Sequence, residues 1–185
     1  MRRTLIALAA AFVLGAGAGA VLLYHSRASA NRMAATATPA WIEVEWPFPL
    51  DQWGMGKAYR CGAAACGAEV NVYVRAKIGF CNCTTGVSDD AELDRISDLE
   101  LIGEQASALA AGKPITVAWM KGRSRVFALR PSGQSMISFG LNEHCDAIVA
   151  TAVVRGAKPE TVEPAVLALL ASKPVIRWTK LTLGL

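Results

Sequence analysis

Apolar and polar residues alternate over much of the chain, and this pattern predicts a sheet. Residues 41–46 alternate bulky with acidic side chains, and residues 68–78 place Val70, Val72 and Val74 on one side and polar residues on the other. A period of two is typical of strands with one buried face. Runs rich in apolar residues predict further strands at 115–120, 125–130, 135–141, 147–154 and 175–183.

Two segments carry helical periodicity instead. The first begins at residues 88–90, where Asp89 and Glu92 have the spacing of a capping box, and its apolar residues recur every three positions up to Ile102. The second covers residues 159–172, where a first-turn proline precedes an apolar stripe of Val162, Val166, Leu169 and Leu170. Strands punctuated by two helices, without a regular β-α-β alternation, predict an α+β fold with a mostly antiparallel sheet.

A cluster of charge at residues 121–125, Lys-Gly-Arg-Ser-Arg, separates two of the predicted strands. Its glycine and serine are typical of a turn, so we expect a solvated hairpin loop here. Of the 19 basic residues, three lie within residues 1–30, whereas all 15 acidic residues lie beyond residue 30. The rest of the chain is almost neutral and lacks the basic stripe of a nucleic-acid-binding protein, so we expect no nucleic acid as a partner.

The first thirty residues have the order of an export signal. Arg2 and Arg3 precede the uncharged residues 4–24, and Ala-Ser-Ala follows at the end of the segment. At about 1.5 Å per residue, a helix of this apolar length crosses a hydrocarbon core of roughly 30 Å. We therefore expect residues 1–30 to be either a transmembrane signal anchor, with residues 4–24 in the membrane, or a signal peptide that is cleaved after Ala30.

Either outcome places the remainder of the protein outside the cytoplasm. Residues 31–40 are small, polar and without periodicity, which predicts a flexible tether. Residues 41–185 have the length of one domain with one core. We expect this domain on the periplasmic side of the cytoplasmic membrane, or free in the periplasm or secreted if the signal is cleaved.

All five cysteines, Cys61, Cys66, Cys81, Cys83 and Cys145, belong to the exported part. Disulfides form in oxidising compartments, so cross-linking is the expected fate of most of these thiols. We expect two disulfides that join the Cys61–Cys66 loop to the Cys81–Cys83 pair through neighbouring strands. An odd number of cysteines leaves one thiol, and Cys145 is the candidate for it.

A metal site or thiol redox chemistry is the alternative role for the same cysteines. Four thiolates from Cys61, Cys66, Cys81 and Cys83, or three of them with His144, would suit zinc or copper(I). Their C-x₄-C and C-x-C spacings differ from the paired knuckles of most structural zinc sites. The sequence also lacks the C-x-x-C motif that is common in thiol redox proteins.

The sequence carries no nucleophile-elbow serine motif, no Walker loop and no nucleotide-binding glycine motif after a predicted strand, so we expect no cofactor and no catalysis. Aromatic residues gather near the start of the domain and form a candidate binding patch of Trp41, Trp46, Phe48 and Trp53. Our hypothesis is a bacterial envelope protein with a non-catalytic, disulfide-linked domain that serves in binding or assembly, with another envelope protein as a candidate partner.

Overall fold

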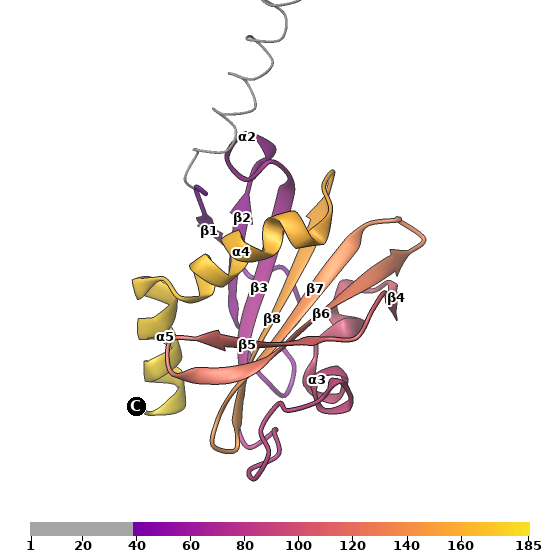
Figure 1. Ribbon diagram of the computed structural model, residues 1–185. Helices are drawn as coiled ribbons and strands as arrows, with labels where there is room; N and C mark the ends of the chain where they lie inside the picture. Colours follow the sequence, from indigo (N-terminus) through magenta and orange to yellow (C-terminus); the bar gives the residue numbers. More distant parts are fainter. Residues whose placement is uncertain (1–38) are drawn as a thin grey trace, which may run out of the picture. The chain divides into compact units, whose positions relative to one another are not determined.

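An antiparallel sheet is the main feature of residues 39–185, the part of the chain that the computed structural model describes (Figure 1). The strands of this part are β1 (Ile42–Val44), β2 (Lys57–Cys61), β3 (Glu69–Lys77), β4 (Gln105–Ala108), β5 (Lys113–Val117), β6 (Met120–Arg130), β7 (Ser135–Glu143) and β8 (Asp146–Arg155). Their order in the sheet is β1-β2-β3-β8-β7-β6-β4. Strand β5 pairs with the first half of β6, and β4 pairs with its second half.

The centre of the sheet is formed by β3, β8 and β7. Consecutive residue pairs join β3 to β8 from Glu69 opposite Arg155 to Lys77 opposite Ala147. Strand β8 continues this ladder into β7 along its whole length. One side of β3 is fully buried, at Val70, Val72 and Val74, as the period of two predicts.

Helices cover both faces of this central sheet. On one face, Val166 of α4 (Pro159–Leu170) belongs to the same buried cluster as Ile148 of β8, and α5 (Lys173–Leu183) extends this layer. On the other face, Leu93 of α3 (Asp90–Ile96) is buried together with Val149 of β8. Ile148 and Val149 are neighbours in one strand and must point to opposite faces. The middle of the sheet is therefore buried between two helical layers.

Most of the predicted elements are confirmed. The strands expected at 68–78, 135–141 and 147–154 correspond to β3, β7 and β8. The helix expected at 159–172 is α4, with proline in its first turn. The helix expected after residue 88 begins as predicted, because the Asp89 side chain accepts a hydrogen bond from the Glu92 N–H. It ends at Ile96, and a separate 3₁₀ turn, η1 (Leu99–Ile102), follows it.

The strand predicted at 175–183 is wrong, because this segment belongs to α5. Its alternation of apolar and polar residues also fits a helix, since Val175 and Thr179 lie four residues apart and are both buried. Pro174 is compatible with the first turn of a helix and begins α5 instead of ending the segment before it. Together with a short helix, α2 (Ala63–Cys66), the described part has four α-helices instead of the two predicted.

The hairpin loop predicted at 121–125 is also wrong, because these residues lie inside β6. The turn between β5 and β6 is two residues long, at Ala118 and Trp119, and Ala118 adopts a positive φ of 53°. Arg123 donates hydrogen bonds to the Asp90 carboxylate, and Arg125 donates one to Asp94. Arg123 and Arg125 therefore fasten α3 to the sheet, whereas Lys121 is exposed.

The predicted signal segment, residues 1–30, and nearly all of the predicted tether lie outside the described residues. Within residues 39–185, no helix combines the length and apolar character that crossing a bilayer requires. The expected anchor at residues 4–24 therefore stays a prediction.

Candidate functional site

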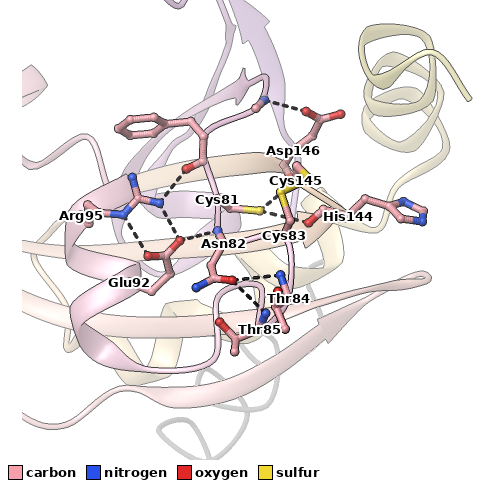
Figure 2. Close-up of a disulfide and its surroundings, with 12 residues drawn as sticks. Cys81, Asn82, Cys83, Thr84, Thr85, Glu92, Arg95, His144, Cys145 and Asp146 are labelled. Atoms are coloured by element: carbon pink, nitrogen blue, oxygen red, sulfur yellow. Dashed lines mark hydrogen bonds and ion pairs between the residues drawn. A yellow bond between two sulfur atoms is a disulfide. The ribbon is translucent and has the colours of Figure 1, made fainter.

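The cysteines of the described part form two disulfides and leave one thiol. Cys61 is joined to Cys66, and Cys83 is joined to Cys145. Cys81 is free and buried, and Figure 2 shows its sulfur beside the second disulfide. The expected links between the Cys61–Cys66 loop and the Cys81–Cys83 pair are therefore not formed, and Cys145 is not the free thiol.

The length of β3 explains why the Cys61–Cys66 loop is not linked to the Cys81–Cys83 pair. Cys61 lies opposite Val70 at the start of β3, whereas Cys81 follows the far end of this strand. A strand advances about 3.3 Å per residue, so β3 separates the two groups of cysteines by roughly 30 Å. A disulfide requires Cα atoms within about 7 Å. Cys61 therefore pairs with Cys66 across α2, where the Cα atoms are 6.0 Å apart.

The turn between β7 and β8 explains why Cys145 is in a disulfide and Cys81 is the free thiol. It consists of His144 and Cys145, and His144 has a positive φ of 52°. The turn brings Cys145 to the segment that follows β3, where the Cys81 N–H donates to the Cys145 carbonyl at 3.0 Å. Gly79, with a φ of 67°, bends the chain just before this contact. The extended geometry assumed for residues 81–83 therefore does not hold, and Cys83 reaches Cys145 while Cys81 turns into the core.

The Cys81 thiol is shielded from solvent and held by main-chain oxygens. Cys81 is 6% exposed, and its Sγ donates to the carbonyl oxygens of His144 at 3.3 Å and Asp146 at 3.5 Å. Burial, together with the carboxylates of Glu92 and Asp146, raises the pKa of the Cys81 thiol to about 11. Only a thiolate is a good nucleophile or metal ligand, so Cys81 is poor at both tasks at neutral pH.

The segment around the second disulfide is fixed by side-chain hydrogen bonds (Figure 2). Asn82 accepts from the N–H groups of Thr84 and Thr85, which closes the turn after Cys81. Glu92 on α3 accepts from the Asn82 N–H and from Arg95. The hydrogen bond from Arg95 and that from the Asn82 N–H lower the pKa of Glu92 despite its partial burial. The disulfide thus sits in a preformed loop that α3 supports.

The proposed metal ligands are not brought together. Cys61 and Cys66 lie at one end of β3, and Cys81 and Cys83 lie beyond the other end. The His144 side chain is 85% exposed and pairs with Glu143 instead of approaching a thiol. Nowhere in residues 39–185 do three or more cysteine, histidine or acidic side chains form a group suited to a metal ion.

The four aromatic residues of the predicted binding patch separate into three places. Trp41 packs against the buried cluster that contains Val166 of α4 and Ile148 of β8. Trp46 and Phe48 meet edge to face, with ring centroids 5.3 Å apart, and both contact Tyr73 of β3. Trp53 lies instead against Phe80, at a centroid distance of 4.5 Å. This last pair borders a cavity.

The cavity beside Trp53 has a volume of about 520 Å³ and lies between β3, α3 and η1. Its lining residues are Asp51, Gln52, Trp53, Arg75, Lys77, Phe80, Asp94, Arg95, Ser97, Asp98, Leu99, Glu100 and Leu101. Lys77 places its ammonium group 5.5 Å from the centre of the Trp53 ring, and Arg95 stacks on Phe80 at 4.6 Å. Cations over aromatic faces are attracted by the ring electrons, so the two rings help to hold these charges in place.

Buried charges form the floor of this cavity. Arg75, at 4% exposure, donates to both oxygens of Asp98 and to Asp51. Lys77, also at 4%, donates to the carbonyl of Ile96 and pairs with Asp98 at 2.8 Å. Burial raises the pKa of Asp51, but hydrogen bonds from Arg75 and the Trp53 N–H outweigh it and lower this pKa overall. The sequence shows Arg75 only as part of the polar side of a strand, so the network was not predicted.

Comparison with other proteins assigns no family to this arrangement. No protein-family model matches the chain, and neither a curated protein nor a solved structure is significantly similar to it. The chemistry of the residues themselves is therefore the basis for a functional conclusion. These residues comprise a buried thiol with a raised pKa and a network in which Asp51 and Asp98 balance the charges of Arg75 and Lys77.

Proposed function

We propose that residues 39–185 are the exported, disulfide-linked domain of a bacterial envelope protein, and that this domain serves in binding or assembly and not in catalysis. The observation that carries the proposal is the pairing of four of the five cysteines in two disulfides. Disulfides persist in oxidising compartments and are rare in the cytosol of most bacteria. They agree with an export signal in residues 1–30, which was inferred independently from charge and hydropathy.

The location follows from the same signal. If residues 4–24 stay in the cytoplasmic membrane, the domain is held at its periplasmic surface. If the signal is cleaved after Ala30, the domain is periplasmic or secreted. The positive charges of Arg2 and Arg3 favour the cytoplasmic side for the N terminus in either case.

Binding is favoured over catalysis by the state of the reactive groups. The charges of Arg75 and Lys77 are balanced by those of Asp51 and Asp98, and most of the hydrogen-bonding positions of this network are occupied. By contrast, the loop above them is open to a partner, since Leu50 is 74% exposed and Met55 is 70% exposed. The same loop lines the cavity with residues 51–53, and exposed apolar side chains are typical of recognition surfaces.

The alternative function is an exported thiol-redox or metal-handling protein. The observation in its favour is the free Cys81 thiol next to the Cys83–Cys145 disulfide. Against it stand the raised pKa of Cys81 and the distance that β3 places between the two groups of cysteines. Binding or assembly therefore agrees better with the geometry.

A fusion of alkaline phosphatase to the C terminus of the full chain tests export, because this enzyme gains activity only where its own disulfides form. We expect an active fusion in the envelope fraction, and N-terminal sequencing then distinguishes an anchor from cleavage after Ala30. The matched control lacks residues 4–24 and should give an inactive cytoplasmic fusion. An inactive, cytoplasmic full-length fusion would overturn the proposal.

A further inference from the structure

A second hollow lies on the opposite side of the sheet, between α5 and the β1–β2 edge. It has a volume of about 490 Å³ and is lined by Glu43, Lys57, Tyr59, Lys173, Pro174, Arg177, Trp178 and Leu181. The last five of these residues recur at helical spacing and form one side of α5. We call this hollow the α5 groove.

Positive charge in the α5 groove is not balanced. Lys57 is paired with Glu43, so these two charges offset each other. Lys173 and Arg177 are exposed, and no side-chain ion pair or hydrogen bond joins them to a described residue. Helix α5 contains no acidic residue, and its N terminus adds the positive end of the helix dipole beside Lys173. The groove therefore attracts an anion.

Tyr59 adds a hydrogen-bond donor to the α5 groove. It is only 6% exposed, and its hydroxyl has no hydrogen-bond partner in the part of the chain that the structure describes, although Tyr59 lines the groove. Burial, with a contribution from Glu43, raises the pKa of Tyr59 to about 12, so the hydroxyl stays protonated at neutral pH and can donate a hydrogen bond. The fully buried, unpaired polar side-chain atoms of the described part do not include this hydroxyl, so it reaches the groove and can donate a hydrogen bond to an acceptor that enters there.

The rim of the groove is apolar. Leu181 and Trp178 line the groove, and Leu181 is 72% exposed. A helix with basic residues and with tryptophan and leucine at its surface is typical of segments that lie at a membrane interface. A soluble anion would leave these side chains in water, whereas a lipid offers them its acyl chains.

We propose that the α5 groove binds the phosphate of an anionic phospholipid headgroup. Lys173 and Arg177 contact the phosphate oxygens, the Tyr59 hydroxyl donates a hydrogen bond to one of them, and Leu181 enters the adjoining acyl region. The choice of a lipid rests on the proposed function, because export with an N-terminal anchor brings the domain to a membrane surface. Anionic lipids attract basic segments near that surface.

Lysine footprinting of the full chain in vesicles tests this proposal. The protein is reconstituted in vesicles of phosphatidylcholine alone, or of an equimolar mixture of phosphatidylcholine and phosphatidylglycerol, and is acetylated briefly before mass spectrometry. We expect acetylation of Lys173 to slow several-fold in the mixed vesicles only. Exposed Lys158, next to α4 and outside the groove, serves as the internal control and should react equally in both.

Matched variants separate a specific site from general attraction between charges. R177Q and K180Q each remove one positive charge from α5, but Lys180 does not line the groove and lies over Trp119. We expect R177Q to abolish most of the protection of Lys173 and K180Q to retain it. Y59F, which removes a single hydroxyl, should reduce the protection while leaving the thermal unfolding temperature nearly unchanged.

Three results would overturn the proposal. The first is equal acetylation of Lys173 in both kinds of vesicle. The second is equal loss of protection in R177Q and K180Q, which would indicate a nonspecific electrostatic effect. The third is full protection by soluble glycerophosphate in phosphatidylcholine vesicles, which would assign the groove to a soluble phosphate ester. The phosphatase fusion reports on export separately, so failure of one experiment is distinguishable from failure of the other.

Discussion

Among single side chains, Asp98 is a buried carboxylate that is paired with two buried cations. It is 6% exposed and accepts hydrogen bonds from Arg75 while pairing with Lys77. Removal of one partner from a buried ion pair leaves the other charges uncompensated, which typically costs about 3–5 kcal/mol. We therefore predict that D98N lowers the free energy of unfolding by about this amount, as measured by urea denaturation.

The matched control for D98N is E69Q. Glu69 also faces two arginines, Arg60 and Arg155, but the contacts are 3.9 and 3.7 Å long and the side chains are exposed. Exposed pairs of this kind contribute about 0–1 kcal/mol. A similar small loss for D98N and E69Q would show that the buried network does not support the fold.

Asp90 makes stability depend on pH. The hydrogen bond from the Gly112 N–H and those from Arg123 lower the pKa of Asp90 below its ordinary value of 3.8. The Asp90 carboxyl group then binds a proton more readily in the unfolded chain than in the folded one. The stabilisation that ionised Asp90 gives to the folded state is therefore complete above pH 3.8 and is lost as the pH falls through the pKa of Asp90 in the folded state.

We predict that wild type loses stability on acidification below pH 3.8 more steeply than D90N does. Thermal unfolding measured over a pH series checks this difference. E160Q, at an exposed position in the first turn of α4, is the control and should follow the wild-type curve. Parallel curves for wild type and D90N would contradict the role given to Asp90.

At the scale of elements, β6 and β7 meet closely because Gly122 has no side chain. A Cβ atom at this position would overlap the carbonyl oxygen of Gly140 on β7. Main-chain atoms cannot yield without separating the strands, so we predict that G122A destabilises the domain by about 3 kcal/mol, the upper end of the usual cost of overpacking. Chemical denaturation measures this loss.

Gly62 provides the control for G122A. A Cβ at Gly62 would meet no heavy atom within 4 Å, and its φ of −80° suits any residue. G62A should therefore change the free energy of unfolding by less than about 1 kcal/mol. Equal effects of the two substitutions would show that the close approach of β6 and β7 is unimportant.

Periodicity predicted the elements whose burial is one-sided and regular. The alternation of Val70, Val72 and Val74 allowed β3 to be predicted, and the apolar stripe along α4 allowed that helix to be predicted. Periodicity failed for α5, because its apolar residues fit both a strand and a helix, and it missed β2, a short edge-side strand between two glycines. Contacts with the rest of the sheet decide whether such a segment becomes a strand or a helix, and the local sequence pattern carries no information about these contacts.

The candidate site was predicted less well than the fold, for a related reason. The cavity at Trp53 joins segments 51–53, 75–80 and 94–101, and only the topology of the sheet and α3 brings them together. The number of disulfides was predicted correctly, but the pairing was not. The turn at His144 that delivers Cys145 to Cys83 depends on a positive φ at a non-glycine residue, which composition does not reveal.

For the whole molecule, the two disulfides differ in how much of the chain they constrain. Cys83 and Cys145 are 62 residues apart, whereas Cys61 and Cys66 are 5 apart. Loop-closure entropy then assigns about 4 kcal/mol to the first bridge and about 2 kcal/mol to the second.

We predict that the double variant C83S/C145S is destabilised about twice as much as C61S/C66S. Denaturant unfolding without reductant measures both losses. The reverse order, or no loss for C83S/C145S, would show that the long bridge does not hold the sheet to the segment after β3.

The central claim is an exported domain held by two defined disulfides, and cysteine mapping tests it most directly. Protein isolated from the envelope is unfolded without reductant, and free thiols are trapped with N-ethylmaleimide at mildly acidic pH to prevent exchange. Peptide mass spectrometry should then find the label on Cys81 alone, with Cys61 linked to Cys66 and Cys83 linked to Cys145. Label on all five cysteines, or a linked Cys81 with a labelled Cys145, would contradict the claim.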